Sequence, residues 1–197
     1  MRKDYEIILK LIPENSKVLD IGCSDGELIS YLENKGVSAQ GVELNQEKVI
    51  KCLEKGLDVI HGDINLIVED FPFNQFDYCL LTQTIQAVQK PEQLLNTLKK
   101  VSKNIIVSFN NSARLSKISN FLLSGSFDSL LKKADSDHWY NTDYIHPCSI
   151  KDFKKLAENL DLKIISTFDV INQRKFENGK IPSNLFCKEV LFHITDE

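Results

Sequence analysis

The chain has 197 residues, of which 42% are hydrophobic, and this length is enough for one domain with a full core. Its 24 basic and 28 acidic residues give a net charge of −4, which argues against nucleic acid as a main partner because nucleic-acid binding usually needs a basic surface. No apolar run approaches the ~20 residues that cross a bilayer, and no long apolar signal segment begins the chain, so we expect a cytoplasmic protein without a membrane partner.

A helix is predicted at the start of the chain, and it ends at Pro13 because proline cannot continue a helix. Its apolar residues recur at helical spacing, and we expect them to pack on the edge of a sheet: Ile7, Ile8 and Leu11. A buried strand follows from Val18 to Ile21, since its residues are apolar except for Asp20 near the carboxyl end.

A glycine turn joins this strand to the next helix, in the sequence VLDIGCSDGEL from Val18 to Leu28. Gly22 and Gly26 permit a tight turn and let backbone approach a ligand without a Cβ clash. The helix, Glu27 to Lys35, carries its apolar residues on one face. Ligands sit at the carboxyl ends of parallel strands, so the turn is typical of a nucleotide site. The same sequence also fits a tight turn with no ligand.

Further strands alternate with helices along the chain. The strands are Ser38 to Glu43, Leu57 to Asp63, Phe76 towards Gln83 and Thr84, and Asn104 to Phe109, and the helices between them include Gln46 to Lys55 and Pro91 to Lys100. This alternation predicts an α/β fold with a parallel sheet and right-handed crossovers. Acidic residues end the first three strands and should meet on one rim, where Glu43 could accept both ribose hydroxyls: Asp20, Glu43 and Asp63.

One segment, Ser124 to Cys148, lacks a clear period. Such a stretch inside a compact domain often forms a functional loop or lid, and this one could reach back over the ligand end of the sheet. The alternative is a structural cap that packs Trp139 and Tyr140 on the domain. We therefore expect a single domain, residues 1–197, with a lid or cap at residues 124–148.

The pattern resembles the class I S-adenosylmethionine-dependent methyltransferases. The sequence DIGCSDG is similar to their first motif, Glu43 to their ribose-binding acid, and Gly62-Asp63 to the strand end that contacts adenine. The resemblance implies a three-layer, doubly wound, Rossmann-like sheet, mostly parallel, with an antiparallel hairpin at the carboxyl end. Two segments suit its last strands, Lys163 to Val170 and Glu189 to Ile194.

That resemblance also implies S-adenosylmethionine or S-adenosylhomocysteine as the cofactor. The residues expected to bind it are Asp20, Gly22, Cys23, Ser24, Glu43, Leu44, Gly62, Asp63, Ile64, Thr82 and Gln83. One departure is Ser24, which replaces the middle glycine of the usual GxGxG and cannot adopt positive φ as cheaply as glycine.

A narrower resemblance covers nearly the whole chain, to the methionine biosynthesis protein MetW family. The segments that carry it most specifically are FDYCLLTQTIQAVQKPEQLL and HWYNTDYIHPCSIKDF. A departure is FNNSARL, residues 109–115, where the family usually has proline followed by aromatic and glycine residues. The resemblance implies a link to homoserine O-acyltransferase. We expect the segment 124–148 to contribute to the partner surface, since Trp and Tyr are frequent interface anchors.

No residue of the sequence stands out as a catalytic group. Methyl transfer needs the nucleophile and the methyl group in line, with a base if the nucleophile carries a proton. His138 and His146 are candidate bases, although a lone histidine is more often structural, and Tyr140 or Tyr144 could orient a substrate or simply pack. Cys148 lacks an evident activating group, and the five cysteines contain no CxxC pair, so we expect reduced thiols and no metal site.

The residues after the fourth strand, LTQTIQAV, contain no proline, which argues against the classes that methylate N6-adenine or glutamine. Gln83 and Gln86 could bind a small polar ligand but cannot act as bases.

Two hypotheses follow. The protein binds the cofactor and acts with homoserine O-acyltransferase, with no methyl transfer required, or it is a small-molecule methyltransferase whose acceptor the sequence does not reveal.

Overall fold

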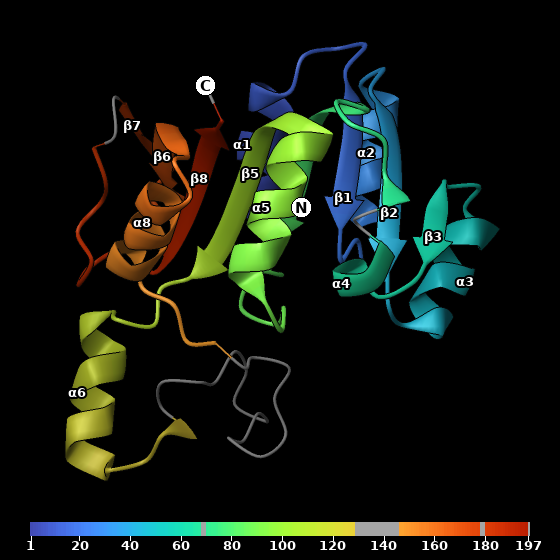
Figure 1. Cartoon of the computed structure of the whole chain (residues 1–197). Coiled ribbons are helices and arrows are strands. Elements are labelled where there is room, and N and C mark those ends of the chain that lie inside the picture. Colours follow the sequence, from blue (N-terminus) through green and yellow to red (C-terminus); the bar gives the residue numbers. More distant parts are fainter. Residues whose placement is uncertain (68–69, 129–145, 178–179, 197) are drawn as a thin grey trace.

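The computed structural model describes residues 1–67, 70–128, 146–177 and 180–196. The helices in these residues are α1 (Lys3–Leu11), α2 (Glu27–Asn34), α3 (Gln46–Glu54), α4 (Ile64–Ile67), α5 (Pro91–Val101), α6 (Leu115–Ser124) and α8 (Ile150–Asn159) (Figure 1). The strands are β1 (Lys17–Ile21), β2 (Ser38–Glu43), β3 (Val59–His61), β4 (Phe76–Thr82), β5 (Ser102–Asn110), β6 (Lys163–Asp169), β7 (Arg174–Glu177) and β8 (Glu189–Thr195).

All the described strands belong to one eight-stranded sheet, in the order β3-β2-β1-β4-β5-β8-β6-β7. The first five strands run parallel to one another, which confirms the predicted parallel sheet. Strand β8 inserts between β5 and β6 and is antiparallel to both. The sheet therefore combines a parallel half, where crossover helices return the chain, with an antiparallel half at the carboxyl end.

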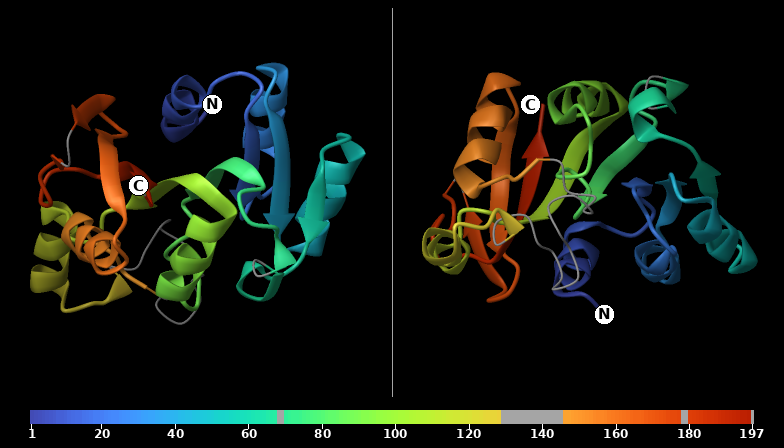
Figure 2. Two further views of the ribbon diagram at one scale, coloured as in Figure 1. Left: turned by 45° about the horizontal axis from the view of Figure 1, so that its top comes forward. Right: turned by 90° about the horizontal axis from the view of Figure 1, so that it is seen from below.

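Helices cover both faces of this sheet, as the two views of Figure 2 show for α5 and α8 on one face and α1 and α2 on the other. The α5 and α8 face holds a cluster of aromatic rings: Phe109 of β5 and Phe192 of β8 pack against Phe153 of α8, with ring centroids 5.3 and 4.7 Å from its ring. Because each face of the sheet has its own apolar core, the parallel strands are apolar on both sides.

The first helix packs on a face of the sheet, and the expectation that it would pack on an edge was wrong. Ile7 and Ile8 are buried together with Leu80 of β4 and Leu191 of β8. Leu11, the third predicted contact, is only half-buried. An apolar helix face buries more surface over the middle of a sheet than beside its last strand, and this placement puts the amino end of α1 near the ends of β5 and β8.

Strand β7 was not predicted from the sequence. It forms a hairpin with β6 at the edge of the sheet, where Ser166 pairs with Glu177 and Asp169 with Arg174. Its residues, RKFE, are mostly exposed, because one side of an edge strand has no neighbour. Charged residues are typical of such an edge since they discourage pairing with another chain.

Helix α6 differs from the other long helices, because none of its ten residues is buried. It ends at Gly125, whose φ of +64° is the left-handed conformation common at helix ends. Most of the irregular segment 124–148 lies outside the described residues, so the lid and cap hypotheses stay predictions. Within the part of the chain that the structure describes, we find no helix that combines the length and the apolar character needed to cross a bilayer.

Candidate functional site

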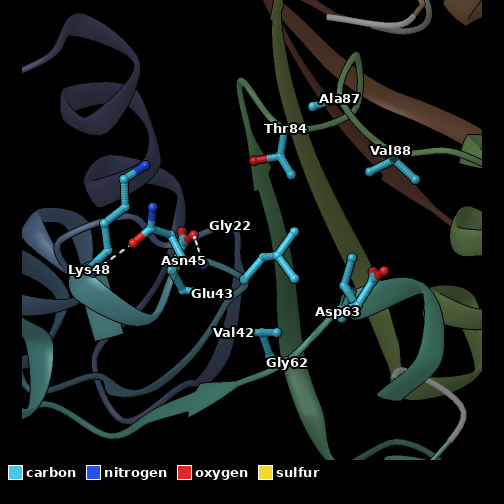
Figure 3. Close-up of a pocket in the computed structure, with 12 residues that line it drawn as sticks. Gly22, Val42, Glu43, Asn45, Lys48, Gly62, Asp63, Thr84, Ala87 and Val88 are labelled. Atoms are coloured by element: carbon cyan, nitrogen blue, oxygen red, sulfur yellow. Dashed lines mark hydrogen bonds between the residues drawn. The ribbon is translucent and has the colours of Figure 1, made fainter. Parts of the chain in front are cut away.

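A pocket of about 570 Å³ opens at the carboxyl ends of β1, β2, β3 and β4 (Figure 3). Asn45 and Lys48 lie on one side of it, and Thr84, Ala87 and Val88 lie opposite. The full lining is Gly22, Val42, Glu43, Leu44, Asn45, Lys48, Gly62, Asp63, Ile64, Thr84, Ala87 and Val88. These residues come from the turns that follow neighbouring parallel strands, which is where ligands bind in open α/β sheets.

The Glu43 side chain is held at the end of β2 by two backbone donors. The Ser24 N–H donates to Oε2 at 2.8 Å, and the Asn45 N–H donates to Oε1 at 2.9 Å. Only 8% of the residue is exposed. A carboxylate oxygen has two lone pairs, so each oxygen keeps one acceptor position after these bonds. Glu43 is thus fixed in one orientation and still able to accept two hydroxyl donors.

Two features of the structure require glycine at position 22: a positive φ and the close approach of Thr84. Its φ is +72°, and a Cβ there would lie 2.7 Å from Oγ1 and 2.9 Å from Cγ2 of Thr84. Thr84 is itself fixed, because its hydroxyl donates to the Ile21 carbonyl at 3.0 Å. The absence of a side chain at Gly22 therefore lets the turn after β1 close against the turn after β4.

Ser24 adopts the strained conformation that its position in the glycine turn demands, with φ of +55°. A non-glycine residue there costs about 1–2 kcal/mol. The strain accompanies the hydrogen bond from its own N–H to Glu43. Ser24 therefore performs the backbone role of the missing glycine at some loss of stability.

Apolar and cationic groups complete the pocket. Leu44 is 65% exposed although it lines the pocket, and Val88 on the opposite side is buried. Asn45 caps α3 by accepting from the Lys48 N–H at 3.2 Å, which places the amino end of α3 and the Lys48 side chain at the rim. The pocket thus offers apolar surface for a flat ring and a carboxylate for hydroxyl groups.

A second polar cluster lies beside the pocket, at the ends of β4, β5 and β8. Asn110 donates to the Gln83 side-chain oxygen at 2.8 Å, and the Gln83 amide donates to Glu189 at 2.8 Å. Gln83 also has a left-handed backbone, with φ of +60°. Burial raises the pKa of Glu189, and the charge of Asp4 raises it further.

Helix α1 brings charged groups to the same region. Asp4 is 1% exposed; it pairs with Arg2 at 2.6 Å and accepts from the Ser108 hydroxyl at 3.0 Å. Asp20 is also 1% exposed, and its Oδ1 has no hydrogen-bond partner among the described residues. Burial raises the pKa of Asp20 to about 7, the Arg2 charge opposes this, and the charges of Asp4 and Glu43 add to it.

The structure separates the predicted cofactor residues into two groups. The pocket lining contains Gly22, Glu43, Leu44, Gly62, Asp63 and Ile64. The other five predicted residues do not line the pocket. Asp20, Cys23 and Thr82 are buried. The Ser24 N–H donates to Glu43, and the Gln83 amide donates to Glu189.

Sequence reasoning missed several residues of this region. In the pocket they are Val42, Asn45, Lys48, Thr84, Ala87 and Val88, and in the adjoining cluster they are Arg2, Asp4 and Glu189. The Asn at the start of α3 was a signal that could have been used, because Asn is a preferred N-cap and α3 begins directly after the acidic end of β2. Nothing in the local sequence marks Arg2 or Glu189.

The candidate catalytic residues fall in different places. His138, Tyr140 and Tyr144 lie outside the described residues. His146 is exposed; its backbone N–H donates to the Gln86 carbonyl at 3.0 Å, and its Nε2 lies 3.2 Å from the Gln89 carbonyl, so it ties two chain segments together. Burial raises the pKa of the Cys148 thiol to about 12, which keeps it neutral and unsuited to nucleophilic attack.

The comparisons with known proteins agree on family and fold. A model of the methionine biosynthesis protein MetW family matches residues 2–194. The chain is 31% identical over 202 residues to the bifunctional methionine biosynthesis protein MetXA/MetW of Rhodopirellula baltica, covering 96% of this chain and 32% of that protein. The chain therefore spans about a third of the length of this curated relative.

Solved structures share the fold at low sequence identity. An S-adenosylmethionine-dependent methyltransferase from Mesorhizobium loti has a TM-score of 0.69 and 12% identity, covering 98% of this chain and 97% of that one. A TehB-like S-adenosylmethionine-dependent methyltransferase from Corynebacterium glutamicum has a TM-score of 0.66 and 15% identity, covering 100% and 89%. The predicted Rossmann-like, methyltransferase-type fold is confirmed.

Proposed function

This chain belongs to the methionine biosynthesis protein MetW family, and from that premise we propose that it binds S-adenosylmethionine or S-adenosylhomocysteine and acts with a homoserine O-acyltransferase. The observation that carries the cofactor proposal is the Glu43 carboxylate, which two backbone donors fix at the pocket wall with an acceptor position left on each oxygen. A ribose presents two adjacent hydroxyls, and this is the group that such a carboxylate recognises.

The other pocket residues fit the rest of an adenosyl group. Leu44 and Val88 supply apolar surface for the adenine ring, and Asp63, two residues after β3, offers an acceptor for the adenine amine. Asp20 lies outside the pocket lining, but its buried Oδ1 has no hydrogen-bond partner among the described residues, and an ammonium group placed close to it would favour its charged form. When bound, S-adenosylmethionine would supply a sulfonium methyl group.

The partner proposal has separate support. The relative from Rhodopirellula baltica is named as a bifunctional MetXA/MetW protein, so one polypeptide carries both parts. A MetX part is a homoserine acyltransferase, the enzyme that activates homoserine. We infer that the present chain associates with such an enzyme and that the bound cofactor reports methionine status to it. This requires that the cofactor favour one conformation of the protein over another.

One experiment tests both parts. The homoserine acyltransferase of the same organism is assayed alone, with this chain, and with this chain plus S-adenosylmethionine or S-adenosylhomocysteine. We expect the chain to change the acyltransferase rate and the cofactor to alter the size of that change. If the two proteins do not co-purify and the acyltransferase rate is the same in all arms, the proposed association is wrong.

A second candidate function is methyl transfer to a small molecule. The observation that favours it is Glu189, a part-buried carboxylate with a raised pKa at the start of β8, which accepts a hydrogen bond from the Gln83 amide. A raised pKa suits a general base that works near neutral pH. Turnover of methyl-labelled S-adenosylmethionine with homoserine and related amino acids, in the parent and in Glu189→Gln, tests it. Absence of labelled product in the parent would leave cofactor binding as the function of the site.

A further inference from the structure

Helix α6 exposes an unusual amount of apolar surface. Leu122 is 75% exposed and Leu123 is 87% exposed at its carboxyl end, and Leu115 is 48% exposed at its amino end. Figure 1 shows the helix standing away from the sheet. A helix of ten residues is marginal by itself in water, since most helix stability in proteins comes from packing an apolar face. Such a helix is suited to being covered by another molecule.

Neighbouring residues extend this surface at both ends of the helix. Beyond the carboxyl end, Phe127 is 63% exposed and its ring packs 5.1 Å from that of Phe121. At the amino end, the Leu115 N–H donates to the Leu185 carbonyl at 2.7 Å, and Leu185 and Phe186 are 42% and 72% exposed. We use the name α6 surface for Leu115, Leu122, Leu123, Phe127, Leu185 and Phe186.

The charges of helix α6 itself favour a different protein over a second copy of the chain. Helix α6 contains Lys117 and follows Arg114, and it contains no acidic residue. In a twofold dimer the same patch faces itself, so these basic groups would meet the same basic groups of the second copy. A different protein can instead present acidic groups around an apolar centre.

We propose that the α6 surface docks the homoserine O-acyltransferase. This inference rests on the proposed function, which supplies the partner, and adds the place of contact. The choice of this partner follows from the Rhodopirellula baltica relative, where the two parts belong to one polypeptide and therefore stay at high effective concentration. Figure 1 shows α6 far from β2 and β3, whose ends line the cofactor pocket, so a partner on α6 would leave the pocket open.

The test compares two variants with matched changes. L122S/L123S removes two exposed leucines from α6, and I50S/L53S removes two exposed apolar residues from α3, where Ile50 is 47% and Leu53 is 55% exposed. Binding of each to the purified homoserine acyltransferase is measured by calorimetry. We expect L122S/L123S to raise the dissociation constant roughly 10-fold or more, as loss of central interface residues does, and I50S/L53S to leave it unchanged.

Folding and cofactor binding serve as internal controls. Both variants should keep the parent circular dichroism spectrum and the parent affinity for S-adenosylhomocysteine, because the replaced side chains are exposed. If L122S/L123S does not fold, the single change Leu123→Ser, at the most exposed of these positions, replaces it with the same expected direction.

Each contrary outcome points to a different error. Equal acyltransferase affinity in L122S/L123S and the parent would overturn the α6 surface as the contact while leaving the association intact. No binding by the parent would overturn the association itself and this docking with it. If sedimentation shows that the parent is a dimer and L122S/L123S is a monomer, the α6 surface binds a second copy of the chain. If the parent binds anionic phospholipid vesicles and L122S/L123S does not, the α6 surface binds a membrane. Either result overturns the proposal.

Discussion

Replacing Glu43 with glutamine tests the central contact of the cofactor site with little change of shape. In the parent, each carboxylate oxygen accepts one backbone N–H, from Ser24 and from Asn45. Glutamine keeps one oxygen and turns the other acceptor into an NH₂ group. That NH₂ would face a backbone N–H, so one hydrogen bond is lost and the other no longer has a charged acceptor.

The size of the effect follows from the geometry. A hydrogen bond to a charged group contributes about 1.5–3 kcal/mol, and Glu43 is 8% exposed, so water cannot easily replace the lost partner. We expect the free energy of unfolding to fall by about 2–4 kcal/mol. A ribose would likewise lose one acceptor and the charge, which should weaken cofactor binding by about 1–3 kcal/mol, or roughly 5- to 150-fold.

Calorimetry with S-adenosylhomocysteine and urea unfolding measure these two quantities. The matched control is Glu47→Gln, which removes the same charge from an exposed residue in the first turn of α3. The control should bind and unfold like the parent. If Glu43→Gln binds the cofactor as tightly as Glu47→Gln does, the carboxylate does not hold the ribose and the proposed site is wrong.

Three further predictions concern the turn after β1 and the acid before it. Ser24→Gly should raise the free energy of unfolding by up to about 1 kcal/mol, since glycine relieves about 1–2 kcal/mol of strain at φ +55° but loses about 0.5–1 kcal/mol more chain entropy on folding; a lower urea midpoint would contradict this. Gly22→Ala should destabilise by about 2–4 kcal/mol through its positive φ and the Thr84 contact, and adding Thr84→Ala should recover part of that loss in a double-mutant cycle. Burial raises the Asp20 pKa to about 7, so the stability that its protonated form contributes is complete below pH ~4, the unfolded pKa, and is lost as pH rises to about 7. The parent should therefore have a lower free energy of unfolding at pH 8 than at pH 5, and Asp20→Asn should make this decrease smaller. A decrease of the same size in the parent and the variant would show that Asp20 does not titrate in this range.

Local sequence determined most of the elements, because strand and helix patterns are short-range signals. The predicted strand Ser38 to Glu43 coincides with β2, and the helix predicted from Gln46 to Lys55 ends one residue beyond α3. The alternation of strands and helices was sufficient for the parallel sheet because right-handed crossovers leave few topologies. Glu43 could be placed on the rim of the sheet for the same reason, since the end of a strand fixes its position.

Tertiary structure alone decided how distant residues meet. Gln83 and Glu189 are 106 residues apart along the chain, and Asp4 and Ser108 are 104 apart, so no local pattern could pair them. The place of α1 over a sheet face depended on the apolar area available there, which forms only when β4, β5 and β8 are side by side. Strand β7 depended on its partner β6, because an exposed edge strand has no apolar alternation of its own. The strain at Ser24 is also a tertiary effect, since the left-handed backbone there orients an N–H towards Glu43 on the neighbouring strand.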